Sequence, residues 1–174
     1  LLPKDYVRFK LTGSYATGAR IAQEVGPRMI KLQLELGGKD PTYVCEDVDV
    51  AAAAASLADG AMYNAGQSCC SVERIYVHEK VHDAFVDAFV REVRGFRLGD
   101  PASEDTYIGP LTRAPQLDVL ERQVADAKDK GAHLLVGGAR LPAPGHWFQP
   151  TVFSRVDHSM ELMREESFGP IIGI

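Results

Sequence analysis

The stretch VDVAAAAASLADGAMYNAGQSCCSVERIYVHEKVHDAFVDAFVREVR, residues 48–94, decides the fold class. Its alanine-rich beginning predicts a helix over Val48–Tyr63, which can pack closely because its side chains are small. A strand is predicted at Arg74–Val77 and an amphipathic helix at Glu79–Arg94. The apolar face of this second helix comprises Val81, Phe85, Phe89 and Val93. A strand between two helices indicates an α/β fold.

The flanking sequence continues the alternation. Upstream, Leu11–Gly13 is predicted as a loop that leads into a helix over Tyr15–Val25, capped by Ser14. Met29–Leu36 alternates apolar and polar residues, as a strand with one exposed face does. The remaining predicted elements are strands at Pro41–Cys45, His133–Val136 and Thr151–Phe153 and a helix at Pro115–Lys130. The sequence therefore predicts an α/β fold with a largely parallel sheet flanked by helices, and a boundary near Gly37–Gly38.

Composition narrows the possible functions. The chain has 174 residues, of which 45% are hydrophobic and 25% charged, as in globular proteins. A net charge of −5 argues against nucleic-acid partners, and the longest strongly apolar run, Val50–Ala58, is too short to span a bilayer. Three cysteines without a secretory segment indicate a reduced, cytoplasmic protein. Because the chain starts without Met and stops within an apolar run, Ile171–Ile174, we expect it to be part of a longer protein.

The segment Asn64–Cys70 joins a predicted helix to a predicted strand and carries two adjacent cysteines. A thiol presented by such a connection can attack a carbonyl carbon, provided that backbone N–H groups or a positive dipole lower its pKa. The alternative is that Cys69 and Cys70 are small buried hydrophobic residues, as most cysteines are. This segment by itself leaves both interpretations open.

Three other segments carry candidate catalytic or binding groups. Glu35 ends a predicted strand before two glycines, where close approach of a ligand and partial desolvation would raise its pKa toward that of a general base. Glu166 can accept hydrogen bonds from a ribose diol, and Phe168 can support a planar heterocycle. Thr12–Gly18 places glycine and serine at a helix start, where free N–H groups favour phosphate. Taken singly, the two glutamates are better explained as solvated surface residues, and the glycine and serine at the helix start are weak evidence for a phosphate site.

In combination and in this order, the segments closely resemble the aldehyde dehydrogenase superfamily. The matching motifs are Gly13-Ser14 with Gly18, Glu35-Leu36-Gly37-Gly38-Lys39, Gly66-Gln67-Ser68-Cys69 and Glu166-Ser167-Phe168-Gly169-Pro170. The resemblance covers essentially the whole chain, and the spacing from Glu35 to Cys69 is similar to that in the family. One departure is that Lys10 and Leu11 separate Phe9 from Thr12-Gly13-Ser14, whereas the family has phenylalanine directly before Thr-Gly-Ser. The turn before the phosphate site is therefore expected to differ in shape.

The resemblance implies a role for individual residues. Cys69 matches the family's nucleophile, and Glu35 matches the general base that activates water against a thioester. Glu166 matches the residue that holds the nicotinamide ribose, and Cys70 is assigned no chemistry. The other positions implied to bind the cofactor are Gly13, Ser14, Gly18, Leu36 and Phe168. No metal is implied.

Lys39 and Arg74 also fit the family pattern, with structural ion pairing as the alternative for both. The resemblance further implies that residues 1–36 are the C-terminal end of a dinucleotide-binding domain. Residues 37–174 would then be a catalytic, thiol-bearing domain that is incomplete at its C-terminus.

The implied activity is oxidation of an aldehyde to a carboxylic acid with NAD or NADP, through a thiohemiacetal and a thioester at Cys69. The expected partner is a small aldehyde, with no nucleic acid and no membrane, and the parent protein is expected to be a dimer or tetramer of identical chains. We expect the chain alone to be inactive, because in the family most of the cofactor site and an oxyanion-binding asparagine come from sequence upstream.

Three other functions are compatible with the sequence. An acylating relative would pass the thioester to coenzyme A and would not need a base for water, so Glu35 favours hydrolysis. A cysteine hydrolase is disfavoured because none of the five histidines lies in a recognisable partner motif. The third alternative is a non-catalytic structural domain.

Overall fold

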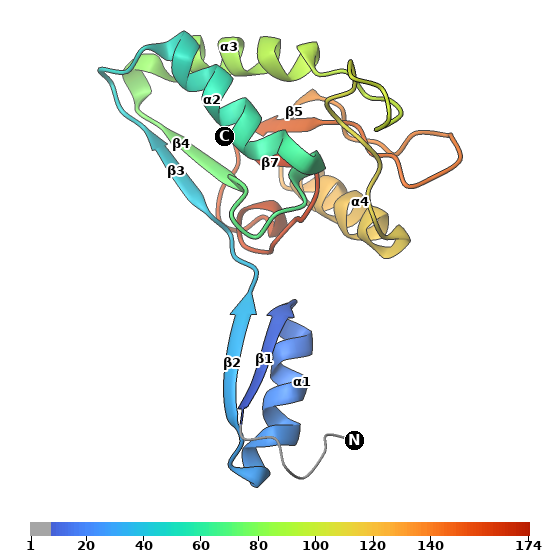
Figure 1. Cartoon of the computed structure of the whole chain (residues 1–174). Coiled ribbons are helices and arrows are strands. Elements are labelled where there is room, and N and C mark those ends of the chain that lie inside the picture. Colours follow the sequence, from blue (N-terminus) through green and yellow to red (C-terminus); the bar gives the residue numbers. More distant parts are fainter. Residues whose placement is uncertain (1–7) are drawn as a thin grey trace. The chain divides into compact units, whose positions relative to one another are not determined.

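A computed structural model describes residues 8–174 of the chain, which forms two compact units, Leu1–Gly38 and Lys39–Ile174 (Figure 1).

The described part of the first unit, residues 8–38, contains two strands and an α-helix. Strand β1 (Arg8–Gly13) pairs in parallel with β2 (Lys31–Leu36), and helix α1 (Tyr15–Val25) with a short 3₁₀ turn, Gly26–Arg28, connects them. Ser14 caps α1, because its side chain accepts a hydrogen bond from the Thr17 N–H. The register pairs Thr12 with Glu35 and Gly13 with Leu36, so both strands end at the same edge.

Two expectations for this unit are corrected. Leu11–Gly13 is not a loop but the end of β1, because parallel pairing with β2 satisfies its backbone groups. The strand predicted at Met29–Leu36 begins only at Lys31, because the 3₁₀ turn precedes it and Met29 has a left-handed φ of 53°. Within β2 the predicted alternation is confirmed, with every second residue facing inward.

The second unit is built on a five-stranded sheet. The strands lie in the order β3-β4-β7-β6-β5, and all neighbouring pairs are parallel except β5 with β6, which is antiparallel. Their bounds are Pro41–Val44 for β3, Arg74–Val77 for β4, His133–Val136 for β5, Thr151–Ser154 for β6 and Ile171–Gly173 for β7. The prediction of a largely parallel α/β sheet is confirmed.

Helices α2 (Val50–Met62) and α3 (His82–Gly95) pack against each other, and α4 (Ala114–Asp129) lies apart from this pair (Figure 1). The Asp49 carboxylate caps α2 by accepting from the Ala51 and Ala52 N–H groups. Short 3₁₀ turns complete the unit, at Tyr63–Gly66, Glu79–Val81 and Glu161–Met163. Each predicted helix is therefore present within a few residues of its expected bounds.

One continuous hydrophobic core fills the second unit. The largest fully buried side chains include Phe85 and Phe89 of α3, Leu120 of α4 and Phe153 of β6. This core fixes the end of α2 and the start of β4, which the cysteine-bearing connection joins. Between residues 8 and 174, no helix is both long enough and apolar enough to cross a membrane.

Candidate active site

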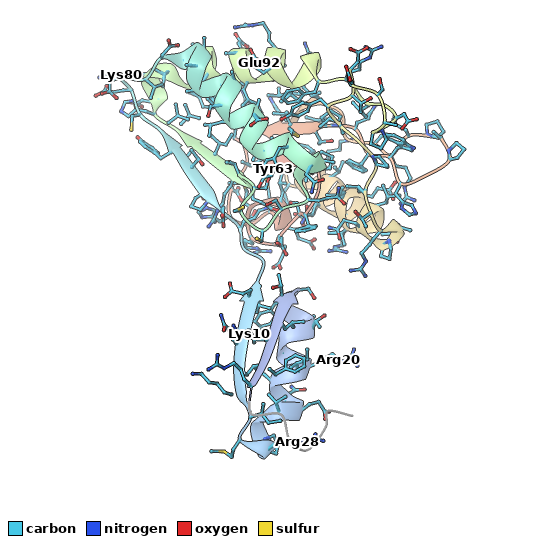
Figure 2. All side chains as sticks on the ribbon, viewed as in Figure 1. Lys10, Arg20, Arg28, Tyr63, Lys80 and Glu92 are labelled. Atoms are coloured by element: carbon cyan, nitrogen blue, oxygen red, sulfur yellow. The ribbon has the colours of Figure 1, made fainter. Side chains whose placement is uncertain are left out.

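The connection Asn64–Cys70, called here the cysteine segment, follows α2 in a strained backbone conformation. Three consecutive residues have left-handed φ angles, 51° at Asn64, 55° at Ala65 and 69° at Gly66. Left-handed conformations are unfavourable for residues with a side chain and persist only where the surroundings impose them. Figure 2 shows Tyr63, whose side chain reaches this connection, at the end of α2.

Polar contacts hold the cysteine segment in this conformation. The Asn64 side-chain amide donates to the Gln67 backbone carbonyl oxygen, and the Gln67 side-chain amide donates to the Asn64 backbone carbonyl oxygen. Both hydrogen bonds are 3.0 Å long. The Gln67 Oε1 atom also accepts from the Thr112 N–H at 2.9 Å. These bonds replace the regular helical pattern that ends at Met62.

Both cysteines of this segment are exposed, as is Cys45. The alternative in which Cys69 and Cys70 are buried hydrophobic residues is therefore wrong. Cys70 Sγ lies 3.2 Å from Ser68 Oγ and 3.4 Å from the Tyr63 hydroxyl oxygen. Hydrogen bonding from Ser68, and next from Tyr63, lowers the pKa of the Cys70 thiol from its ordinary value.

The segment Arg164–Pro170, called here the glutamate segment, leads directly into β7. Ser167 is fully buried, whereas Phe168 is 37% exposed and has a left-handed φ of 45°. The Glu73 carboxylate accepts hydrogen bonds from the Ser167 and Phe168 N–H groups. The segment is therefore fixed in its middle by Glu73, one residue before β4, and at its C-terminal end by its continuation into β7.

The cysteine and glutamate segments touch at their glycines. A Cβ atom added to Gly66 would lie 2.1 Å from the Gly169 carbonyl oxygen, far inside van der Waals contact. Only a residue without a side chain permits this approach. The structure thus brings the motif that carries Cys69 against the motif that carries Glu166 and Phe168.

The carboxyl ends of β1 and β2 in the first unit carry four of the predicted site residues, Gly13, Ser14, Glu35 and Leu36. In parallel sheets this edge, with the N-terminus of the following helix, is where ligands bind. Glu35 is exposed and accepts a hydrogen bond from the Gln33 side chain at 3.3 Å.

Gly18 has a packing role in the structure. It is buried in α1, and a Cβ atom there would lie 2.9 Å from a methyl group of Leu36. The glycine therefore allows α1 to lie close to β2, and Leu36 packs against this helix face.

Lys39 and Arg74 differ in what they contact. Lys39 forms an ion pair with Glu73, and both side chains are almost fully buried. Burial lowers the pKa of the Lys39 ammonium group, and the Glu73 carboxylate opposes that shift. Arg74 instead donates to the carbonyl oxygens of Lys39 and Met163. Structural ion pairing, the alternative given for both residues, is therefore observed for Lys39. Arg74 instead holds two backbone carbonyl groups.

Sequence reasoning missed Glu73 and the glutamines of α4 that contact the glutamate segment. Gln116 donates to the Ser167 carbonyl oxygen, and Gln123 donates to those of Glu165 and Glu166. A glutamate beside an arginine at the start of a strand has no sequence signal for burial. In the described part of the chain, no group of three or more His, Cys, Asp or Glu side chains could hold a metal ion.

The second unit is thus an α/β domain in which the cysteine segment and the glutamate segment lie against each other. The model of the aldehyde dehydrogenase family matches residues 4–174, and the chain belongs to that family.

Curated relatives agree with this assignment. The chain is 40% identical over 168 residues to the 3,6-anhydro-alpha-L-galactose dehydrogenase of Vibrio sp. (strain EJY3), covering 94% of this chain and 35% of the relative. It is 42% identical over 168 residues to the D-glyceraldehyde dehydrogenase (NADP(+)) of Thermoplasma acidophilum, covering 94% of this chain and 34% of the relative. The chain thus spans about a third of the length of these relatives.

Solved structures show the same fold. The 3,6-anhydro-L-galactose dehydrogenase in complex with NAP superimposes with a TM-score of 0.92 at 40% identity, over 96% of this chain and 36% of that one. A C291A mutant of aldehyde dehydrogenase C from Pseudomonas syringae, in complex with NAD+ and octanal, gives a TM-score of 0.93 at 32% identity, over 98% and 36%.

Proposed function

We propose that this chain supplies the reacting thiol of an enzyme that oxidises an aldehyde to a carboxylic acid with NAD or NADP. The observation that carries the proposal is the contact of Gly66 with Gly169, which places the cysteine segment against the glutamate segment. In this proposal residues 1–36 belong to a dinucleotide-binding domain and residues 37–174 to the catalytic domain.

Cys69 acts as the nucleophile in the first half of the reaction. Its thiolate adds to the aldehyde carbon, forming a C–S bond and placing negative charge on the former carbonyl oxygen. The Cys69 backbone N–H is one donor available to that oxygen. Loss of a hydride from this thiohemiacetal leaves a thioester on Cys69.

Glu35 acts in the second half. Its carboxylate takes a proton from water as the water oxygen attacks the thioester carbon. The C–S bond then breaks, the carboxylic acid leaves, and the Cys69 thiolate is restored. An acylating reaction with coenzyme A as acceptor would not require this base, and Glu35 therefore favours hydrolysis.

The residues present fit a nicotinamide dinucleotide. Gly13 and Ser14 place the N-terminus of α1, an 11-residue helix, where its free N–H groups can bind the pyrophosphate, beside Leu36. Glu166 would accept hydrogen bonds from the nicotinamide ribose, and the exposed ring of Phe168 would lie against that end of the cofactor. When bound, the nicotinamide ring supplies the hydride acceptor.

The activity belongs to a full-length protein, because this chain matches about a third of each dehydrogenase relative. We expect the chain alone to show no aldehyde turnover with NAD or NADP. The full-length protein would be a homo-oligomer, and its free thiols favour the reducing cytoplasm.

The test compares variants of the full-length protein with a panel of aldehydes. Cys69→Ser is expected to lower turnover by about three orders of magnitude or more, because a hydroxyl is a far weaker nucleophile at neutral pH. Glu35→Gln is expected to give one burst of reduced cofactor per active site and then stop, because the thioester is not hydrolysed. Cys45→Ser, an exposed cysteine outside the cysteine segment, is the control and should retain activity.

Full activity of Cys69→Ser would contradict the proposed nucleophile. Release of a coenzyme A thioester instead of the free acid would establish the acylating alternative. Absence of turnover in the unaltered full-length protein would favour a structural domain.

A further inference from the structure

A buried carboxylate lies beside the proposed site without a part in the mechanism. Glu73, one residue before β4, is 4% exposed, and both of its oxygens accept backbone hydrogen bonds from the glutamate segment. Oε2 accepts from the Ser167 N–H at 2.9 Å, and Oε1 accepts from the Phe168 N–H at 3.1 Å. A glutamate buried in this way needs partners for each oxygen.

Lys39 completes the set of partners. Its ammonium group pairs with Glu73 Oε2 and also donates to Ser167 Oγ at 2.8 Å. The pair is nearly dry, since 6% of the Lys39 side chain and 5% of the Glu73 side chain are exposed. A dry ion pair with several hydrogen bonds has a fixed geometry, because no water can replace its partners.

The opposite side of the glutamate segment is held from α4. Gln116 donates to the Ser167 carbonyl oxygen, and Gln123, fully buried, lies 3.4 Å from both the Glu165 and the Glu166 carbonyl oxygens. The amides of Ser167 and Phe168 thus bond to Glu73, whereas the carbonyl oxygens of residues 165–167 bond to α4. The Ser167 side chain is buried against Lys39, whereas the Phe168 ring is 37% exposed.

This clamp has a conformational consequence at Phe168. A phenylalanine with a φ of 45° is in the left-handed region, which is unfavourable for a residue with a Cβ atom. The carboxylate of Glu73 accepts from the amide of Phe168 and from the amide just before it, and so stabilises the turn that points this ring outward.

We propose that Glu73, held by Lys39, is a positioning residue that fixes Glu166 and Phe168 in the orientation that binds the nicotinamide ribose. This inference rests on the proposed function, in which those two side chains contact the cofactor. Glu73 itself touches the backbone of the glutamate segment and not the reacting atoms.

The test uses Glu73→Gln in the full-length dehydrogenase. Glutamine has the same size but replaces one accepting oxygen with an NH₂ group, which cannot accept from a backbone N–H. The KM for NAD or NADP is expected to rise about 10- to 100-fold, because a misplaced binding group weakens the productive complex. The deuterium isotope effect measured with an aldehyde labelled at its carbonyl carbon should also rise, as hydride transfer becomes slower.

Three comparisons separate positioning from general damage to the fold. Alkylation of Cys69 without cofactor should keep its rate in Glu73→Gln. Glu73→Asp retains the charge and both oxygens, so it should recover part of the cofactor affinity. Glu46→Gln removes an exposed carboxylate, paired with Lys80, and should leave the cofactor KM unchanged.

An unchanged cofactor KM in Glu73→Gln, with the unaltered protein active, would overturn the positioning role and leave the proposed function standing. A lack of turnover in the unaltered protein would instead overturn the proposed function. If Glu73→Gln fails to fold, Glu73→Asp decides, and a cofactor KM equal to that of the unaltered protein with slower Cys69 alkylation would overturn the inference.

Discussion

At the residue scale, Cys70 has hydrogen-bond partners that the sequence motif around Cys69 does not predict. Ser68 Oγ lies 3.2 Å and the Tyr63 hydroxyl 3.4 Å from its sulfur. Hydrogen bonds to sulfur stabilise the thiolate, so the pKa of Cys70 is lowered. The hydrogen bond between Tyr63 and the Cys70 sulfur also raises the pKa of the Tyr63 hydroxyl.

Because a lowered pKa increases the thiolate fraction below the ordinary titration range of a cysteine, Cys70 should react with iodoacetamide at lower pH than a free thiol does. Ser68→Ala removes the largest cause and should move the midpoint of the alkylation profile upward. The measurement is the rate against pH in Cys45→Ser/Cys69→Ser, where Cys70 is the remaining cysteine.

Ser56→Ala, an exposed serine on α2, is the matched control for this profile. A midpoint that stays in place in Ser68→Ala would show that the hydroxyl does not set the acidity of Cys70.

The same scale shows what sequence can reveal about a site. Cys69, Glu35 and Glu166 are recognisable because each lies in a short motif of neighbouring residues. Glu73 is not, because its burial depends on Lys39, 34 positions away, and on Ser167, 94 positions away. A carboxylate next to an arginine at a strand start is typical of surface as much as of core, and only the folded chain distinguishes the two.

At the scale of elements, the contact between the cysteine and glutamate segments depends on one missing side chain. Gly66→Ala would place a methyl group 2.1 Å from the Gly169 carbonyl oxygen and require alanine at a φ of 69°. Since both effects disfavour the native state, we expect the free energy of unfolding to fall by about 2 kcal/mol or more. Urea denaturation of the chain measures the change.

Gly95→Ala at the end of α3 is the control, because open space surrounds that position. It should alter the free energy of unfolding by no more than about 1 kcal/mol. Equal effects of the two substitutions would mean that the two segments can separate without loss.

Elements with a clear periodicity of apolar residues could be predicted from the sequence, whereas a strand that is defined by its pairing with another strand could not. The alternation of β2 and the apolar face of α3 follow from residue order alone. Strand β1 was not predicted because Gly13, followed by Ser14, is typical of a loop before a helix. Only the parallel pairing of Thr12 and Gly13 with Glu35 and Leu36 makes them part of a strand.

At the scale of the whole molecule, the hydrophobic core is concentrated in one unit. The core cluster draws its members from Val44 to Ile174, whereas among residues 8–38 Val25 is the buried hydrophobic residue. Residues 39–174 expressed alone should therefore keep their helical circular dichroism and unfold in one cooperative thermal transition. Residues 1–38 alone should show no such transition, because so short a segment cannot bury a stable core.

A gradual, non-cooperative melt of residues 39–174 would contradict the division after Gly38.

The strand order of this unit could not be predicted from the sequence. No local pattern indicates that β7 lies between β4 and β6, since those contacts join distant parts of the chain.

The central place of β7 has a consequence for biosynthesis. Strands β3, β4, β5 and β6 leave the ribosome earlier, yet β4 and β6 both hydrogen-bond to β7. The nascent chain must therefore hold two half-sheets with open edges until Ile171–Gly173 emerges. The glutamate segment emerges immediately before β7, so the step that joins the two half-sheets is also the step that completes the proposed cofactor contact.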